Sequence, residues 1–230
     1  RLYAVWKLET YTITYDANGG NGGPVSQQKT YNKDLKISGI RPKKNGYTFA
    51  GWAKSRGASR CTYKSGEVFR ENKDTKLYAV WKIKTYSVVY DANGGSNSPS
   101  SQVKTYGRDL VLSKNKPKRE NYLFAGWAKE KNSMTCSYKP GGTYKANASI
   151  RLYAVWIRDA FQIQYDANGG VGAPVSQMKR RSETISISKT RPYKSGYTFL
   201  GWGKTPNART ISYYPGDRYA GVEDMKLYAM

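Results

Sequence analysis

The sequence predicts a tandem array of three small, strand-rich domains, each of them β or α+β, instead of one large domain. The first observation is internal self-similarity with a constant period of 75 residues, which is typical of repeat architectures. The second is that short runs of alternating apolar and polar residues, the pattern of half-buried strands, are separated by turn residues about every 8 to 12 positions. The period relates two sets of three aromatic residues, each spaced by 75 positions. One set is Trp52, Trp127 and Trp202, and the other is Tyr15, Tyr90 and Tyr165.

The period divides the chain into three repeats and a short leading segment. Repeat 1 covers residues 7–81, repeat 2 covers 82–156, and repeat 3 covers 157–230 and is one residue shorter. Residues 1–6 correspond to the end of repeat 1, so we expect them to be the last strand of a further, upstream repeat. We therefore expect the chain to be part of a longer array. Domains of this length are near the small end of what one hydrophobic core supports.

Each repeat begins with a predicted strand and a turn. Residues 11–15 alternate between apolar and polar types, which favours a half-buried strand. An Asp-Ala-Asn-Gly-Gly motif follows in every repeat. Asn-Gly favours positive φ angles, and the aspartate can cap nearby backbone amides. The predicted turn residues are Asp16, Asn18, Gly19, Asp91, Asn93, Gly94, Asp166, Asn168 and Gly169.

The remaining elements follow in order. Residues 26–31 fit a short helix or a strand, and the local pattern does not decide between them. Residues 35–38 alternate as a strand does, residues 46–52 form an aromatic strand after a proline, and residues 77–81 close the repeat. No Pro, Gly or Ser tract separates consecutive repeats, so we expect stiff strand-to-strand junctions.

Shared apolar positions form the predicted cores, and 21 Tyr and 6 Trp supply much of their area. Cys61 and Cys136 occupy one equivalent position, which Ile211 fills in repeat 3, so we interpret it as a buried apolar site. Equivalent sites should lie about 30 Å apart, beyond the reach of a disulfide. The predicted core includes Trp52, Trp127, Trp202, Trp81, Trp156, Cys61, Cys136 and Ile211.

These motifs together resemble the Listeria-Bacteroides repeat family, the type of module found as the B repeat of internalins. The resemblance covers all three repeats, and the Gly-Tyr-Thr-Phe-x-Gly-Trp stretch at residues 46–52 is its most specific part. Repeat 2 departs from it with Asn121 and Leu123, and repeat 3 lacks the last tryptophan. The resemblance implies α+β modules with a β-grasp fold, ubiquitin-like or SUMO-like, which we expect in an elongated, monomeric arrangement. It also implies an extracellular protein of the bacterial cell surface or cell wall.

The chain is strongly basic, with 39 Lys and Arg against 16 Asp and Glu, a net charge of +23. The excess can serve solubility. It can also bind an acidic glycan, wall polymer or host surface component through repeated cations. No nucleic-acid-binding motif is present, so no specific nucleic acid partner is expected. The predicted polyanion contacts are Lys29, Lys104, Lys179, Lys54, Lys129 and Lys204.

We predict no enzyme, catalytic residue, cofactor or metal. The chain has no His, and the aspartate of the turn motif is the only acidic residue present in every repeat. The pattern of a calcium loop is missing, and the glycines at 18–23 lack the Lys-Ser/Thr of a phosphate loop. Intramolecular isopeptide bonds from Lys to Asn or Asp are left open.

The sequence therefore predicts a non-catalytic stalk or spacer region of an adhesin. The alternative is an adhesive array that binds polyanions through periodic Lys and Arg faces. No apolar signal peptide or membrane-spanning run occurs, which says nothing about location for part of a longer array.

Overall fold

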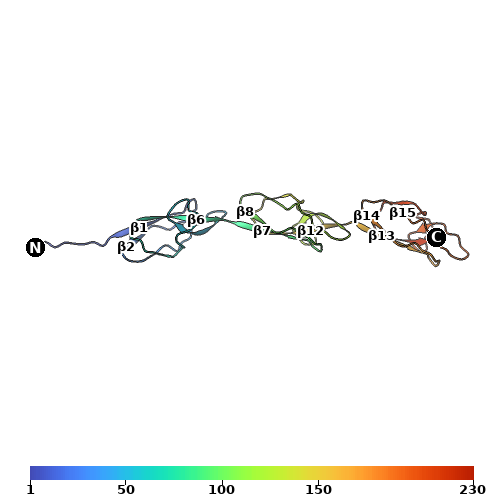
Figure 1. Cartoon of the computed structure of the whole chain (residues 1–230), viewed down its shortest axis with the longest axis horizontal. Coiled ribbons are helices and arrows are strands. Elements are labelled where there is room, and N and C mark those ends of the chain that lie inside the picture. Colours follow the sequence, from blue (N-terminus) through green and yellow to red (C-terminus); the bar gives the residue numbers. More distant parts are fainter. The chain divides into compact units, whose positions relative to one another are not determined.

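The computed structural model describes residues 1–230 and contains strands and connecting loops without any helix (Figure 1). The predicted α+β class with a β-grasp fold is therefore wrong, and each repeat is all-β. The chain separates into two compact units, and the boundary between them passes through repeat 2. The first unit comprises Arg1–Val88, Ser101–Val111 and Thr143–Ile150, and the second comprises Val89–Ser100, Leu112–Gly142 and Arg151–Met230.

Repeat 1 contains a four-stranded sheet and a two-stranded sheet. The larger sheet has the order β2-β1-β6-β4, in which β1 and β6 are parallel and the outer pairs are antiparallel. The smaller sheet pairs β3 with β5. The strands are β1 (Thr10–Asp16), β2 (Gln27–Thr30), β3 (Leu35–Lys36), β4 (Tyr47–Ala53), β5 (Val68–Phe69) and β6 (Thr75–Ile83).

Repeats 2 and 3 have the same sheet orders as repeat 1, namely β8-β7-β12-β10 with β9-β11, and β14-β13-β18-β16 with β15-β17. In repeat 2 the strands are β7 (Thr85–Asp91), β8 (Gln102–Thr105), β9 (Leu110–Val111), β10 (Tyr122–Ala128), β11 (Thr143–Tyr144) and β12 (Ile150–Arg158). In repeat 3 they are β13 (Ala160–Asp166), β14 (Gln177–Arg180), β15 (Ile185–Ser186), β16 (Trp202–Gly203), β17 (Arg218–Tyr219) and β18 (Met225–Ala229).

Residues 26–31, for which the sequence allows either a helix or a strand, contain strand β2. The loop that follows it cannot supply the apolar stripe that a helix needs to cover a sheet. Ile37 is its one buried aliphatic residue, whereas Ile40 is 55% exposed. Pro42 and a positive φ at Asn32 also break any helical path. Side chains from the two-stranded sheet cover the core instead.

The core of repeat 1 is built around Trp52, which is fully buried. Its indole meets the rings of Tyr15 and Phe49 edge-on, at centroid distances of 4.9 and 5.0 Å. Repeat 3 repeats this arrangement around Trp202. The other buried residues packed with Trp52 are Ile13, Ile37, Phe69, Leu77 and Ala79. The alternation along β1 and β6 therefore places one face of the sheet in the core.

Consecutive repeats are joined by a single residue between two strands. Lys84 lies between β6 and β7, and Asp159 lies between β12 and β13. The Lys84 amide donates to the carbonyl of Gly46 in repeat 1 (2.8 Å), and its carbonyl accepts from the amide of Tyr106 in repeat 2 (3.0 Å). Each of these junctions lies within one compact unit. The linking residue is thus hydrogen-bonded to both neighbouring repeats.

Candidate functional site

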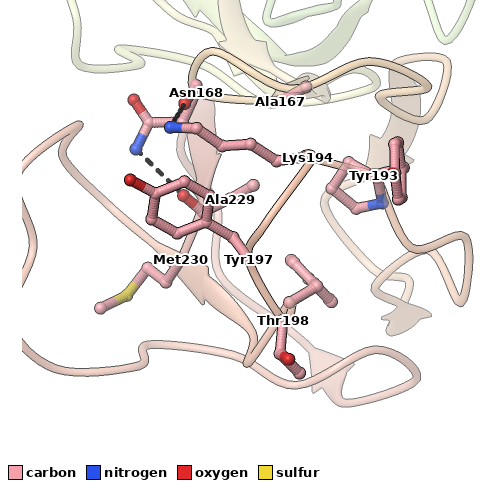
Figure 2. A pocket seen from close by; sticks show the side chains of 10 residues that line it. Ala167, Asn168, Tyr193, Lys194, Tyr197, Thr198, Ala229 and Met230 are labelled. Carbon is pink, nitrogen blue, oxygen red and sulfur yellow. Dashed lines mark hydrogen bonds between the residues drawn. The ribbon is translucent and has the colours of Figure 1, made fainter.

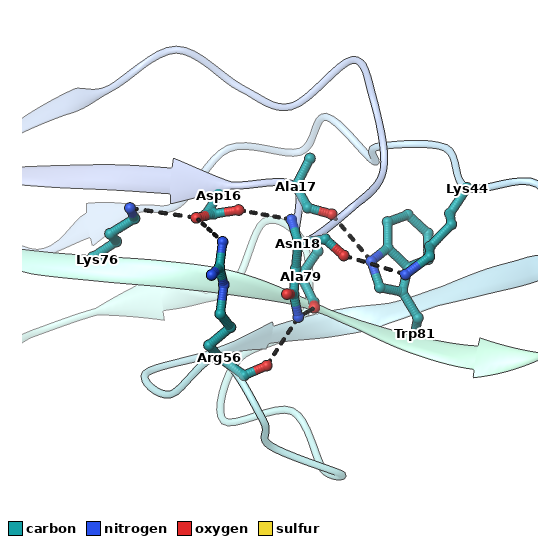
Figure 3. Close-up of polar contacts among 8 residues, drawn as sticks. All are labelled: Asp16, Ala17, Asn18, Lys44, Arg56, Lys76, Ala79 and Trp81. Carbon is teal, nitrogen blue, oxygen red and sulfur yellow. Dashed lines mark hydrogen bonds and ion pairs between the residues drawn. The ribbon is translucent and has the colours of Figure 1, made fainter.

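The Asp-Ala-Asn-Gly-Gly motif forms the same tight turn in every repeat. Figure 3 shows the turn of repeat 1. In repeat 1, Asn18 and Gly19 have φ angles of 49° and 83°, which suit a type I′ turn. The Gly20 amide donates to the Ala17 carbonyl (2.9 Å), and the Asp16 carboxylate accepts from the Asn18 amide (2.8 Å). Asp91 and Asp166 accept the equivalent bonds from Asn93 and Asn168.

The turn also holds the closing strand in place, a role that the local sequence pattern does not reveal. The side-chain amide of Asn18 donates to the Ala79 carbonyl in β6 (2.9 Å) and to the Arg56 carbonyl (3.0 Å) (Figure 3). The Trp81 indole donates to the Ala17 carbonyl (3.0 Å). A Cβ on Gly20 would lie 2.5 Å from this indole. The second glycine of the motif is therefore required by the packing of the tryptophan.

Cations surround the turn aspartate. Asp16 pairs with Lys76 (3.3 Å) and Arg56 (3.8 Å), and Asp166 pairs with Lys226 (2.9 Å). The hydrogen bond from the Asn18 amide, together with these cations, lowers the pKa of Asp16, and Lys226 lowers that of Asp166. No group of three or more His, Cys, Asp or Glu side chains is placed to hold a metal ion. The carboxylates of the motif therefore serve the turn itself.

A hollow lies beside the turn in every repeat, and a cation stands over a tyrosine ring at its wall. In repeat 3, the Lys194 ammonium is 4.7 Å from the Tyr197 ring centre and donates to the Asn168 carbonyl (3.3 Å) (Figure 2). The equivalent pairs are Lys44 with Tyr47 (4.9 Å) and Arg119 with Tyr122 (4.0 Å). The sequence signal for these pairs is a basic residue three positions before a tyrosine.

The hollow of repeat 3 encloses about 200 Å³ and is lined in part by Ala167, Phe199 and Met230. In repeat 1, the counterparts of Ala167 and Phe199 contact the indole of Trp81. The space therefore corresponds to the position that a tryptophan side chain occupies in repeats 1 and 2. Its shape is explained by the packing of the repeat and is no evidence for a small-molecule ligand.

Three of the predicted polyanion contacts, Lys29, Lys104 and Lys179, are each only 1% exposed. Their burial is incompatible with contact to a polymer in solution, because the ammonium groups face protein acceptors. The edge strand places each lysine stem against the core, as amphipathic side chains allow. Lys29 donates to the Asn72 side chain (2.7 Å) and to the Thr30 carbonyl (3.3 Å).

The equivalent lysines differ in their acceptors. Lys104 donates to the Asn147 side chain (3.0 Å), whereas repeat 3 has Val222 at this position and Lys179 donates to the Arg180 carbonyl (2.9 Å). These contacts are hydrogen bonds.

The other predicted contacts, Lys54, Lys129 and Lys204, lie at the surface. Each ammonium is within 6.0 Å of the centre of a tyrosine ring: Tyr63, Tyr138 and Tyr213 respectively. Lys54 also pairs with Glu71, and this contact is the largest factor that lowers the pKa of Glu71 to about 2. Lys204 is 4.0 Å from Glu223. These three lysines are the exposed members of the predicted set, and no ion pair is formed by Lys129.

The shared cysteine position lies at the edge of the core and not inside it. Cys61 is half-buried and Cys136 is exposed, so the prediction of a buried core site is wrong for these two residues. Gly51, at a β-bulge in β4, has φ near 150°, and a Cβ there would lie 2.7 Å from the Cβ of Cys61. Ile211 lies in the same way beside Gly201. The side chain covers this glycine from outside, which explains why either Cys or Ile is accommodated.

The predicted tryptophans divide into two groups. Trp52, Trp127 and Trp202 are fully buried, whereas Trp81 and Trp156 are half-buried and donate to the turn. The first group lies in the cores, and the second group connects the last strand of a repeat to its first turn.

Comparison with known proteins identifies related sequences across the whole chain. A model of the Listeria-Bacteroides repeat domain family matches residues 11–80, 86–155 and 161–230. Two proteins of Evansella cellulosilytica are 29% and 27% identical over 99% of this chain, and their names describe a Gly-rich membrane protein and a membrane protein. Internalin H of Listeria monocytogenes is 29% identical over 66% of the chain.

The matched regions are small parts of these relatives, covering 26%, 34% and 26% of their lengths. The structure contains no helix that is long and apolar enough to cross a membrane. The predicted boundaries of the repeats stay predictions, although the three matched segments lie one inside each of them.

Proposed function

This chain belongs to the Listeria-Bacteroides repeat domain family, and we propose that its three repeats are a non-catalytic spacer in an adhesin of the bacterial cell surface. The names of its relatives, which include membrane proteins and an internalin, support a surface location. The observation that carries the proposal is the junction between repeats. A spacer has to keep its two ends a defined distance apart. A flexible linker does not, because it behaves as a random coil with a variable end-to-end distance.

The junctions supply this property through backbone contacts. The linking residues, Lys84 and Asp159, each donate to the repeat before and accept from the repeat after. The Asp159 amide donates to the Asn121 carbonyl (2.8 Å), and its carbonyl accepts from the Arg181 amide (2.7 Å). A bend at either residue would break hydrogen bonds on both sides. The geometry is therefore favourable for repeats that keep a defined spacing.

Small-angle X-ray scattering of the whole chain tests the spacer. At roughly 30 Å per repeat, the expected maximum dimension is about 90 Å. A matched variant with four glycines inserted after Lys84 should show a broader distance distribution, because the inserted residues separate the two hydrogen bonds. A compact particle, or a parent chain with the same flexibility as the insertion variant, would contradict the proposal.

A second function, polyanion binding, is supported by the exposed cations that recur beside tyrosines. Lys129 and its counterparts in repeats 1 and 3 present an ammonium over a ring, which suits an anionic sugar. Because they occur once per repeat, a long polymer could engage several of them and gain affinity by multivalency. The partner class we propose here is an acidic glycan or wall polymer.

Retention on a heparin-like resin tests this second function. A variant in which Lys54, Lys129 and Lys204 are all changed to Gln should elute at a lower salt concentration. Its affinity for the resin should also depend less on salt. The control removes the same charge from another exposed, equivalent set: Arg41, Lys116 and Arg191. An equal decrease in both variants would indicate net charge alone, and no decrease in the first would contradict the site.

A further inference from the structure

The two junctions in this chain use the same backbone bonds but different side chains. At the junction of repeats 1 and 2, Gly46 is buried beneath the ring of Tyr106. A Cβ on Gly46 would lie 2.1 Å from two ring carbons of Tyr106, so no other residue fits there without moving the ring. The glycine also has a φ of +76°, but the close approach of the ring is the stricter requirement.

At the junction of repeats 2 and 3, the equivalent positions hold Asn121 and Arg181. Asn121 has a φ of 60°, which shows that this position accepts a residue other than glycine despite its left-handed backbone. Arg181 donates from its side chain to the Arg158 carbonyl (2.9 Å), and its guanidinium lies over Phe161, 5.3 Å from the ring centre. Glycine therefore occurs at the junction where a tyrosine ring covers it. Asparagine occurs at the junction where the arginine side chain packs against Phe161 instead.

The same two positions also occur at the outer ends of repeats 1 and 3. Gly196, the counterpart of Gly46, is exposed, and a Cβ built on it meets nothing within 4 Å. Tyr31, the counterpart of Tyr106, is 44% exposed. Its amide donates to the Glu9 carbonyl (2.9 Å), as the Tyr106 amide does to Lys84. One half of a glycine–tyrosine junction is thus already formed at each outer end.

We infer that the Gly196 end of repeat 3 is an interaction surface for another repeat of this family that has an aromatic residue at the position of Tyr106. Gly196 provides the flat backbone that the ring covers, and its open surface continues the geometry of the first junction. An incoming repeat with arginine at this position would not need the glycine, as Asn121 demonstrates. The inference concerns how repeats recognise one another and does not depend on the spacer role.

The repeat 1 end of a second copy is the natural probe, because it has Tyr31. Joining Ala229 of one copy directly to Val5 of the next preserves the 75-residue period, since Ala4, Ala79, Ala154 and Ala229 are equivalent. Glu9 of the second copy then takes the place of Lys84. We expect its amide to donate to Gly196 and to exchange with solvent as slowly as the Lys84 amide. Glu9 of the first copy, in the same molecule, should exchange fast.

Substitution of Gly196 by Ala tests the side-chain pairing. In the unfused chain, Gly196→Ala measures only the cost of the left-handed backbone, because the Cβ meets open space. In the fused chain it should lower the melting temperature by a further 4 °C or so, on the scale of one lost close contact. Gly46→Ala is the positive control, and Tyr31→Ala in the fused chain should remove the additional effect of Gly196→Ala.

Two results would overturn the inference. One is a fused chain in which both Glu9 amides exchange equally fast, which needs no substitution and so does not depend on how a variant folds. The other is an equal effect of Gly196→Ala in the fused and unfused chains.

Discussion

Single residues in this chain carry roles that their chemical type does not reveal. Lys29, Lys104 and Lys179 are among the largest fully buried side chains, although lysine is almost never fully buried unless it is paired. Their Nζ atoms donate to neutral acceptors, backbone carbonyls in all three repeats and a side-chain amide in repeats 1 and 2. A buried ammonium of this kind keeps its hydrogen bonds but loses most of its hydration, so it stabilises the fold little.

Lys179 is the lysine whose replacement should be most favourable, because Val222 stands where repeats 1 and 2 have an asparagine acceptor. We expect Lys179→Met to raise the free energy of unfolding by about 1 kcal/mol, as an apolar side chain of similar volume removes the desolvation cost. Chemical denaturation measures the change. Lys204→Met, at the surface, should stay within about 0.5 kcal/mol. A loss of stability in Lys179→Met would mean that the buried ammonium is favourable.

The three buried tryptophans each have an indole N–H group without a hydrogen-bond partner. They are Trp52, Trp127 and Trp202, and all three are fully buried. An unpaired buried donor has a cost of about 1 to 3 kcal/mol. The large apolar area of the indole and its edge-on contacts with Tyr and Phe rings offset this cost. The indole is therefore retained for its size and shape.

At the scale of elements, the turn after the first strand organises each repeat. In repeats 1 and 3 its asparagine adopts positive φ, donates to the last strand and donates to a loop, so three separate segments meet at one side chain. Asn93 in repeat 2 also has positive φ and donates to the last strand. The tryptophan of the last strand then bonds to the same turn. The first and last elements of the repeat are thereby connected, which explains why a domain of this size has a defined closing strand.

The turn asparagine should therefore be among the more sensitive positions outside the core. Asn18→Ala loses two side-chain hydrogen bonds and forces alanine into a left-handed conformation. We expect a decrease of about 2 to 3 kcal/mol in the free energy of unfolding, measured by urea denaturation. Asn45→Ala, at an exposed position in the same repeat, is the matched control and should change little. Equal effects of the two variants would show that the turn does not hold the strand.

The loop between β5 and β6 should make repeat 1 sensitive to acid. Lys54, Lys73 and Tyr63 surround Glu71 and lower its pKa from 4.5 to about 2. A lowered folded-state pKa stabilises the protein above pH 4.5, and this stabilisation is lost as the pH falls toward 2. Repeat 2 has Ala146 at this position.

Melting temperatures of the parent chain and of Glu71→Gln, measured from pH 6 downward, test this effect. The parent should be more stable near neutral pH, and the two curves should converge near about pH 2, where the carboxyl is protonated in both states. A constant difference between the two curves would exclude the carboxylate as the cause. Glu183→Gln, an exposed substitution in repeat 3, is the control.

At the scale of the whole molecule, the net charge of +23 is a source of self-repulsion. Apart from the Lys54–Glu71 pair, the ion pairs in the chain are mostly exposed and contribute little each. We therefore expect added salt to stabilise the chain, because screening of the repulsion outweighs the loss of surface pairs.

Thermal unfolding in increasing sodium chloride measures this response. The melting temperature should rise with salt. The variant with Arg41, Lys116 and Arg191 changed to Gln has three fewer exposed positive charges and should respond less. A melting temperature that falls with salt would mean that the ion pairs outweigh the repulsion.

The sequence by itself determined the period, four of the six strands of each repeat, the Asn-Gly turn and the central tryptophan, because these follow from local alternation and from φ preferences of single residues. It left residues 26–31 open between a helix and a strand and gave no signal for β5. Only the tertiary structure decided what covers each surface. The sheet is covered by Ile37 and Phe69 instead of a helix, Lys29 turns inward, Cys136 stays at the edge, and Tyr106 closes over Gly46. Burial depends on segments distant in the chain, and a local pattern of side chains cannot encode which of them will lie against it.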